Sequence, residues 1–238
     1  MSSHSEAAIP PANEHRAILA PQKMDVLQRE IEQGVEILKK GGVIAFPTDT
    51  VYGLGADAFN AVAVERIYAI KGRPRHRQLP LLIADAEQLA ILTTDELPEI
   101  ALFLATRFWP GGLTLVLPRA DSLPSYLAPG PGIAVRIPDH PLCLALIQHL
   151  GNPIIGTSAN ISGRPPALTA DDVRQQLAAK IDFVIDGGRC PGGKESTVVD
   201  VIHQTPLILR EGIIPSYEID RAYKEYMESD SEAHSYRL

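Results

Sequence analysis

Residues 43–58 read VIAFPTDTVYGLGADA. The first five residues form a short apolar run, which predicts a buried strand. The run leads into a glycine-punctuated loop that carries Thr48, Asp49, Thr50 and Tyr52. Glycine allows close approach of backbone to a ligand, although Thr and Asp also satisfy backbone groups in ordinary turns. Both interpretations stay open, but polar residues at a strand end are the usual place for a ligand site in an α/β sheet.

Regular elements are predicted on both sides of this stretch. Leu27, Ile31, Val35 and Leu38 follow a helical stripe that a pair of glycines ends. Further helices are expected over 60–70, 86–92, 95–108, 140–150 and 169–179. Strands are expected over 79–85, 113–117, 133–137 and 153–158, and in FVIDGG (183–188), STVVDV (196–201) and PLILREG (206–212). Apolar strands interleaved with helices predict an α/β domain with a twisted, open sheet of mixed parallel and antiparallel strands, covered by helices.

The composition is that of a globular protein. Of the 238 residues, 45% are hydrophobic and 21% charged, and the formal net charge is -7. Nucleic-acid-binding domains are usually basic, so a polyanionic ligand should meet a local pocket rather than a global field. Two cysteines, no apolar run of membrane-spanning length and no signal-peptide core predict a cytoplasmic protein without membrane contact. We expect one domain over 21–220, between polar tails at 1–20 and 221–238.

The most concentrated positive charge lies in residues 71–77, KGRPRHR. Lys71, Arg73, Arg75 and Arg77 repel one another when close, and a bound anion would relieve that repulsion. A solvated basic turn is the alternative, since charge runs are usually surface. The alternation around the proline favours Arg73 and Arg77 turned inward and Arg75 turned outward.

A second polar strand end is GTSANISGRPP (156–166), which carries the pair Ser158 and Asn160. It is not the GxSxG nucleophile elbow, because alanine follows the serine and the second glycine is missing. His140 and His149 could approach in space, which keeps a serine nucleophile as the lesser alternative. We interpret Ser158 and Asn160 as hydrogen-bonding groups for an anion.

The glycine-rich stretch 187–200 superficially matches a phosphate-binding P-loop, with Lys194 after two spaced glycines. The motif needs Ser or Thr next and then a helix, whereas Glu195 follows and β-branched residues come after it. The stretch is therefore expected to be a flexible loop that delivers Ser196 to the start of a strand.

Two arginines lie within apolar strands. Arg136 interrupts IAVRI on the face opposite its isoleucines, and Arg210 ends PLILR. A buried, unpaired guanidinium costs several kcal/mol, so each needs an anionic partner or an opening to a cavity. A structural salt bridge to Asp200 or Glu211 is the alternative for Arg210.

These residues coincide with the motifs of a known family. The chain resembles the YrdC-like, or threonylcarbamoyl-AMP synthase, family over about residues 25–215. The shared motifs, in order, are FPTDTVYGLGADA, the K-x-R of KGRP, FWPGGLTLVLP, AVRIPDHP, the S-x-N of TSANISG, ESTVVD and LILREG.

The resemblance implies a short, single-domain form with a deep, positively charged cavity. It also implies that L-threonine, bicarbonate or CO2 and ATP, with Mg2+ on the ATP and no metal site in the protein, give threonylcarbamoyl-AMP and pyrophosphate. A partner enzyme then uses the product to modify tRNA. A YrdC-like paralogue that binds double-stranded RNA or tRNA without synthase activity is the alternative function.

The site residues follow by matching motifs position by position. The threonine-contacting positions are Thr50, Arg136 and Ser196. The ATP-contacting positions are Lys71, Arg73, Arg77, Ser158, Asn160 and Arg210, of which Lys71 and Arg73 are the expected catalytic residues. One departure concerns threonine: some relatives carry a histidine where this chain has Leu82.

Overall fold

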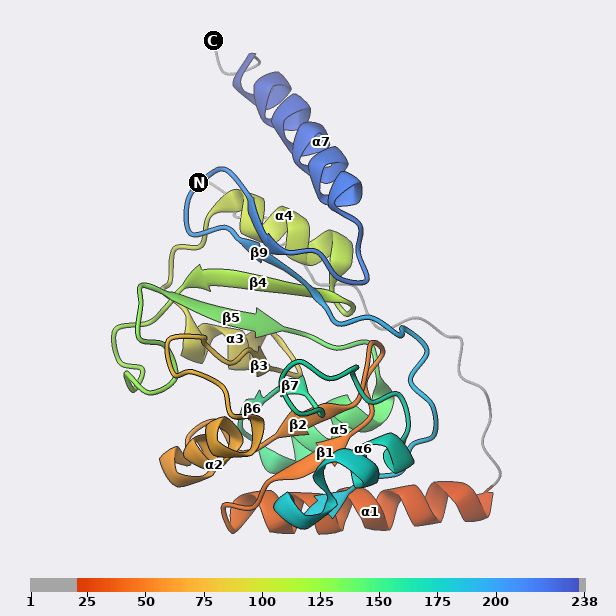
Figure 1. Ribbon diagram of the computed structural model, residues 1–238. Coiled ribbons are helices and arrows are strands. Elements are labelled where there is room, and N and C mark those ends of the chain that lie inside the picture. Colours follow the sequence, from red (N-terminus) through yellow and green to blue (C-terminus); the bar gives the residue numbers. More distant parts are fainter. Residues whose placement is uncertain (1–20, 236–238) are drawn as a thin grey trace.

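The structure is a computed structural model that describes residues 21–235 (Figure 1). The predicted tail at 1–20 lies outside the described residues, as do residues 236–238. No helix between residues 21 and 235 is both long and apolar enough to cross a bilayer.

The stretch 43–58 contains a β-hairpin. Strand β1 (Ile44–Phe46) pairs antiparallel with β2 (Gly53–Gly55). From the sequence, residues 53–55 are expected to belong to a loop, because a Gly-Leu-Gly run has little strand propensity. Its glycines are needed for packing: a Cβ on Gly55 would come within 2.6 Å of both the Phe46 ring and the Ile155 carbonyl oxygen.

The first sheet has the strand order β7-β2-β1-β8. Strand β7 (Thr157–Ser158) is antiparallel to β2, and β8 (Phe183–Val184) is parallel to β1. The order places the loop after β1 beside the loop after β7. The two polar strand ends seen in the sequence are therefore neighbours.

The second sheet has the order β10-β9-β4-β5-β3-β6. Its strands are β3 (Leu81–Leu82), β4 (Leu113–Pro118), β5 (Gly132–Arg136), β6 (Ile154–Ile155), β9 (Thr197–Asp200) and β10 (Leu207–Arg210). The β4–β9 and β3–β5 pairs are parallel and the others antiparallel. Mixed pairing is thus confirmed, but the strands divide between two sheets rather than one.

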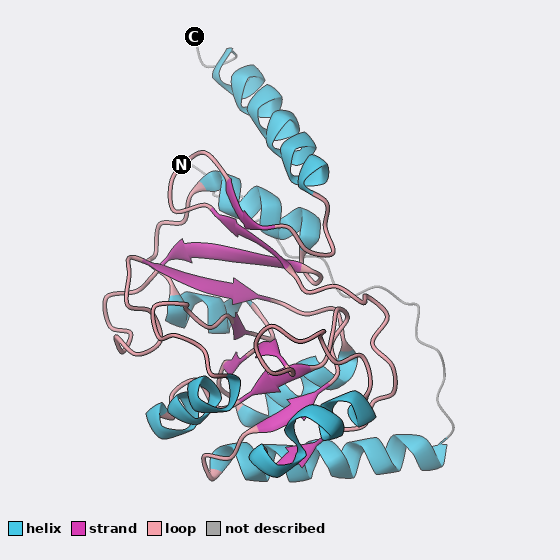
Figure 2. Cartoon of the chain, in the orientation of Figure 1, coloured by secondary structure: helices cyan, strands magenta, loops and turns pink. Residues whose placement is uncertain are grey.

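The division occurs inside the predicted strand 153–158. At Gly156 the chain leaves the second sheet for the first, where a Cβ would lie 2.3 Å from Cγ of Leu82. The absence of a side chain at this position lets the two sheets meet closely. Strand β6 of the second sheet is followed along the chain by β7 of the first (Figures 1 and 2).

Helices cover the sheets much as the apolar periodicity predicts. They are α1 (Pro21–Lys39), α2 (Ala61–Lys71), α3 (Ala86–Leu92), α4 (Glu99–Phe108), α5 (Pro141–Leu150) and α6 (Ala170–Leu177), which a short 3₁₀ turn (Ala178–Lys180) follows. The stripe of α1 packs on α5 and β1, with Ile31, Val35 and Leu38 buried. At the start of α6, the backbone N–H of Asp172 donates to Thr169 and the backbone N–H of Thr169 to the Asp172 carboxylate, as a capping box requires.

The prediction of a tail over 221–238 is wrong as far as Ser235, because α7 (Ser216–Ser235) is a helix that packs on α4. Ile219 and Ala222 are buried, and the rings of Phe103 and Tyr226 lie 5.6 Å apart between centroids. These residues recur at helical spacing, a signal that the polar composition of the segment concealed. In Figure 1 the far end of α7 projects away from the rest of the chain.

Candidate functional site

A cavity of about 1020 Å³ opens where the two sheets meet. Its lining comes from both sheets, from the end of α2, from the loops that follow β1 and β7, and from residues 193–196. The volume suits a ligand larger than an amino acid alone. All nine site residues taken from the motifs line it: Thr50, Lys71, Arg73, Arg77, Arg136, Ser158, Asn160, Ser196 and Arg210.

Arg136 is buried at one end of the cavity and is held on three sides. Its Nε donates to the carbonyl of Gly111 (2.8 Å), and its two terminal nitrogens donate to Thr50 Oγ1 (3.0 Å) and to Asp49 Oδ1 (2.6 Å). The Asp49 carboxylate is the anionic partner that the strand position required. A guanidinium has five N–H groups, so two are left to face a ligand.

The hydroxyl of Thr50 lies in a network of hydrogen bonds next to Arg136. Thr48 Oγ1 donates to the carbonyl of Val51 (2.6 Å), accepts from the backbone N–H groups of Thr50 and Val51, and lies 3.0 Å from Thr50 Oγ1. Thr50 Oγ1 in turn accepts from Arg136 at 3.0 Å. These contacts fix the position of the Thr50 side chain at the cavity wall.

Burial shifts the pKa values of Asp139 and His140, two residues that lie near Asp49. Burial first, and then Asp49, raise the pKa of Asp139, whose backbone N–H donates to Asp49 Oδ1 at 3.2 Å. Burial lowers the pKa of His140, against the effect of Asp49. Nδ1 of His140 is buried without a hydrogen-bond partner among residues 21–235.

Ser196 and Arg210 meet in the cavity beside Thr114 of β4. Ser196 Oγ lies 2.8 Å from Thr114 Oγ1 and accepts from Arg210 at 3.2 Å. Arg210 also donates twice to the carbonyl oxygen of Ser196 and once to Glu195 Oε2, at 2.9 Å. The salt-bridge partner is thus Glu195, and the alternatives Asp200 and Glu211 are wrong.

The strand that carries Arg210 differs from the prediction of a buried strand. It lies at the edge of its sheet, with Leu207 61% and Leu209 54% exposed. An apolar run alone does not tell a central strand from an edge strand. The exposed position opens the Arg210 side chain onto the cavity.

Lys71 ends α2 and is only 4% exposed. Its Nζ donates to the carbonyl of Ser158, to the carbonyl of Asn160 (3.0 Å) and to Asn160 Oδ1 (3.3 Å), and it lies 3.5 Å from Ser158 Oγ. Burial lowers the pKa of Lys71 to about 8, which Glu195 opposes and the neighbouring Arg73 and Arg210 reinforce. The K-x-R and S-x-N motifs are therefore in direct contact.

The serine-nucleophile alternative gains no support from this arrangement. The hydrogen-bond contact of Ser158 Oγ in the described chain is the Lys71 ammonium, and neither His140 nor His149 lines the cavity. A base that takes the serine proton is required for nucleophilic attack.

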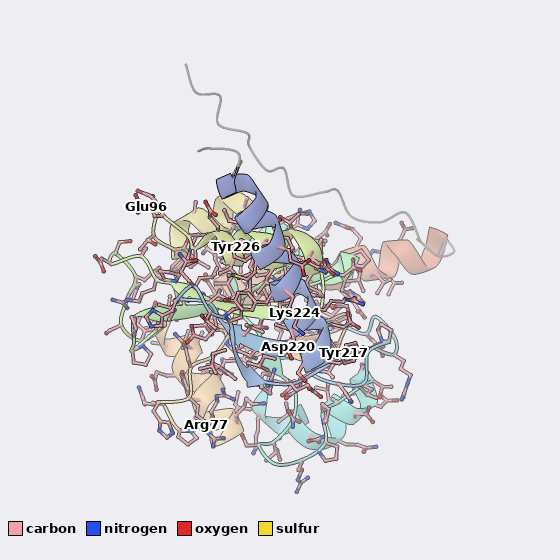
Figure 3. All side chains as sticks on the ribbon, turned by 90° about the horizontal axis from the view of Figure 1, so that it is seen from above. Arg77, Glu96, Tyr217, Asp220, Lys224 and Tyr226 are labelled. Atoms are coloured by element: carbon pink, nitrogen blue, oxygen red, sulfur yellow. The ribbon has the colours of Figure 1, made fainter. Side chains whose placement is uncertain are left out.

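The basic stretch 71–77 divides only in part as its alternation indicated, because Arg77 is exposed rather than turned inward. Arg73 is half-buried and donates to the carbonyls of Arg77 (2.9 Å) and Gln78 (2.9 Å), which aims it along the cavity wall. Burial lowers the pKa of Arg73. Arg75 turns outward to an ion pair with Glu65. Arg77 lines the cavity rim and lies at the outer edge of the molecule near α2 in Figure 3.

The lining is strongly cationic overall. It carries seven Lys or Arg side chains but two carboxylates, those of Glu195 and Glu211, among residues 21–235. Glu211 is engaged elsewhere, because its Oε2 accepts from the backbone N–H of Ser216 at the start of α7. A chain with net charge -7 thus concentrates positive charge in one hollow, which favours an anionic ligand.

Motif matching did not assign several residues that shape the site. Asp49 forms an ion pair with Arg136, and Glu195 forms one with Arg210. The lining also includes Leu82, Arg164 and Lys194. Asp49 and Glu195 are both adjacent in sequence to predicted site residues. Their partners, however, lie 87 and 15 residues away, so sequence proximity alone gave no signal for the pairing.

Fold and site together define an α/β protein with a cation-lined cavity between two mixed sheets. The model of the Sua5/YciO/YrdC family, described as "Telomere recombination", matches residues 36–212. The chain belongs to this family.

Similar proteins of known name agree with the assignment. The threonylcarbamoyl-AMP synthases of Pyrococcus abyssi and Bacillus subtilis are both 46% identical, over 189 and 193 residues. These alignments cover 79% and 80% of this chain but 55% and 56% of the relatives, so the chain spans about half their length. A putative threonylcarbamoyl-AMP synthase of Mycobacterium tuberculosis is 37% identical, with 80% of this chain and 88% of the relative covered.

Solved structures show the same architecture. P. abyssi Sua5 complexed with L-threonine has a TM-score of 0.77 at 44% identity, with 81% of this chain and 56% of that chain covered. Escherichia coli YciO has a TM-score of 0.72 at 32% identity, with 81% and 93% covered. The α/β fold predicted from the sequence is confirmed by these likenesses.

Proposed function

We propose that this chain forms threonylcarbamoyl-AMP and pyrophosphate from L-threonine, bicarbonate or CO2, and ATP. The observation that carries the proposal is the convergence of all nine motif residues on one cationic cavity. The names of its relatives, and the L-threonine bound to P. abyssi Sua5, support the same reaction.

The amino acid is assigned to the Arg136 end of the cavity. The two spare N–H groups of Arg136 suit a carboxylate, and planar guanidinium–carboxylate pairs are geometrically specific. The Thr50 hydroxyl, which accepts from Arg136 and also lines the cavity, can hydrogen-bond to an N–H or O–H group of the same ligand. An amino acid that carries both an amine and a hydroxyl satisfies these demands together.

The phosphates are assigned to the Arg73, Arg77 and Arg210 side. These guanidiniums are more exposed than Arg136 and come from different elements, so together they surround an extended anion. Apolar side chains of the second sheet, among them Val116, Val198 and Leu209, line the same space and offer a surface for a nucleoside base.

The chemistry requires two bond-forming steps. The neutral threonine amine bonds to the carbon of CO2 and loses a proton to give a carbamate; from bicarbonate the same carbamate forms with loss of water. A carbamate oxygen then bonds to the α-phosphorus as the bond from that phosphorus to the leaving pyrophosphate breaks. Both steps bring anions together, so positioning and charge neutralisation supply most of the catalysis. Arg73 faces the phosphates directly. Lys71 holds Ser158 and Asn160 in place, since its Nζ contacts are with those two residues.

Magnesium is proposed to enter with ATP. Among residues 21–235, no group of three or more His, Cys, Asp or Glu side chains could hold a metal ion. The two carboxylates of the lining already contact Arg210 and the Ser216 backbone. Phosphate oxygens and water would therefore supply most of the ligands, as is usual for Mg2+ on nucleotides, and the ion would neutralise phosphate charge.

The RNA-binding alternative is less well supported. Its basic residues would have to lie on an outer face, whereas here they converge on a hollow, and the chain is acidic overall. Transfer of the product to a tRNA-modifying partner enzyme in the cytoplasm remains part of the proposal.

The test is a reconstitution with the purified full chain. Incubation with labelled threonine, bicarbonate and Mg-ATP should release pyrophosphate and form a threonine-dependent adenylate, measured by chromatography and mass spectrometry. Reactions without threonine or without bicarbonate are the controls. Pyrophosphate release that does not depend on threonine, or no product at all, contradicts the proposal.

A further inference from the structure

The Glu195 carboxylate is an anionic group in a cavity whose lining is mostly cationic. It pairs with Arg210 NH1 at 2.9 Å, and both side chains line the cavity. The second carboxylate of the lining, Glu211, is tied to the start of α7. Glu195 is thus the carboxylate that stands where a phosphate oxygen would bind Arg210.

Arg210 does not need Glu195 to keep its orientation. Its Nε and NH2 both donate to the carbonyl oxygen of Ser196, at 3.2 and 2.8 Å, and NH2 also reaches Ser196 Oγ. These bonds leave NH1 as the group that Glu195 occupies. Removal of the carboxylate would free NH1 for a ligand without releasing the guanidinium.

Glu195 can withdraw without a change of backbone. Its carbonyl accepts from Ile213 N at 2.8 Å, and the backbone of Gly212 packs so closely that a Cβ there would lie 2.2 Å from the same oxygen. Its side chain is 34% exposed, and so has solvent into which it can rotate. The backbone is therefore fixed while the carboxylate is displaceable.

We propose that Glu195 is a specificity-determining residue that competes with phosphate for Arg210. Its carboxylate takes one of the two N–H groups of Arg210 NH1, so a phosphate that binds NH1 through both of them must displace it. The inference rests on the proposed function, because it concerns the phosphate side of the same cavity. An exposed ion pair is weak, so a polyphosphate that meets several cations can displace Glu195, whereas a single phosphate gains less.

The competition also bears on release of the product. Once pyrophosphate has formed, the return of Glu195 to Arg210 shortens the stay of the leaving anion. Glu195 also lies close enough to Lys71 and Arg73 to raise the pKa of each, because a nearby negative charge stabilises the protonated form. The Glu195 charge therefore acts on Lys71 and Arg73 as well as on Arg210, although only Arg210 forms an ion pair with it.

The test measures binding of inorganic tripolyphosphate to the full chain by titration calorimetry, in buffer without divalent metal ions. Glu195→Gln removes the charge and keeps the shape. We expect it to bind tripolyphosphate roughly threefold to fivefold more tightly than the native chain, the upper part of the range that the weak Glu–Arg pair allows. The gain should shrink at high salt, because exposed charges are screened.

Glu65→Gln is the matched control. Glu65 also pairs with an arginine, Arg75, and its side chain is 39% exposed, but it lies outside the cavity. It changes the net charge by the same amount, and its tripolyphosphate affinity should stay within about twofold of the native value. An equal gain in both variants would assign the effect to net charge and overturn the proposal.

An Arg210→Gln chain isolates the contribution of the Glu195–Arg210 contact. In an Arg210→Gln chain, the further Glu195→Gln change should no longer tighten binding. A persistent gain there, an unchanged or weaker affinity of the single Glu195→Gln variant, or no tripolyphosphate binding by either chain would each refute the competition. These outcomes are independent of catalysis: a chain that shows the gain but makes no threonine-dependent adenylate would contradict the proposed function alone.

Discussion

The Arg136 end and the Arg210 end of the cavity, meaning the residues that contact each arginine, hold arginines of opposite character. The Arg136 side chain is 6% exposed and fixed by Gly111, Thr50 and Asp49. The Arg210 side chain is 42% exposed and shares its contacts between Ser196 and the Glu195 carboxylate. The Arg136 end is preorganised before any ligand arrives, and the Arg210 end can exchange a partner.

The difference fits the two kinds of ligand that we assign to these ends. A small amino acid is discriminated by a rigid site whose donors and acceptors are fixed, because unpaired polar groups penalise a wrong ligand. A flexible polyphosphate gains affinity from the summed charge of several side chains and needs less exact geometry. Burial of Arg136 thus favours selection of the amino acid, and exposure of Arg210 favours binding and release of the polyphosphate.

The largest expected effect concerns the stability of the rigid end. Arg136→Ala would leave the buried Asp49 carboxylate without its cation, which should lower the free energy of unfolding by about 3–5 kcal/mol. Urea denaturation measures this. Arg66→Ala, which breaks a half-exposed pair with Asp182, should cost about 1 kcal/mol or less. Equal losses in the two variants would remove the contrast between the buried and exposed arginines.

The exposed end should show the reverse pattern. Arg210→Ala is expected to change the unfolding free energy by no more than about 1 kcal/mol, because its ion pair is exposed. Turnover should nevertheless fall on the order of 100-fold, if the guanidinium stabilises phosphate charge that develops in the reaction. Steady-state pyrophosphate release gives the rate. A stable variant with native turnover would show that phosphate does not use Arg210.

Lys71 lies near Arg73 and Arg210, and its titration gives a smaller effect. Burial lowers its pKa from 10.5 to about 8, so between about pH 8 and 10.5 the unfolded chain binds more protons at this site than the folded chain does. The unfolding free energy of the native chain should therefore rise with pH relative to Lys71→Met, by about 1 kcal/mol from pH 7.5 to 9.

The Lys71 prediction is checked by urea denaturation of both chains at each pH, with the difference between them plotted. Taking the difference cancels groups that titrate in both chains. A flat difference, or one that falls as pH rises, would mean that the Lys71 ammonium is not disfavoured by its burial.

The smallest effect separates two arginines of the basic stretch. Arg77 lines the cavity and Arg75 pairs with Glu65 outside it. Arg77→Ala should weaken ATP binding about fivefold, as the loss of one solvent-exposed charge contact allows, and Arg75→Ala by less than twofold. Calorimetric titration with ATP compares them directly. Similar losses would mean that the stretch acts as a diffuse basic patch instead of a sorted cluster.

Much of the architecture was accessible from sequence because it depends on local patterns. Apolar periodicity located α1, α2 and α5, and the Thr169–Asp172 pair marked the start of α6. The alternation in 71–77 separated Arg75 from its neighbours. The missed elements carried contrary local signals: glycines in β2, and a polar composition over α7.

The sequence by itself determined which residues carry the chemistry: hydroxyls and arginines at strand ends, in motifs that one family shares. Only the tertiary structure decided their partners and therefore their behaviour. Asp49 fixes Arg136, Ser158 and Asn160 surround Lys71, and Glu195 covers Arg210. Residue type and local pattern are encoded along the chain, but burial and charge pairing depend on which strands become neighbours, and that is settled only when the two sheets meet.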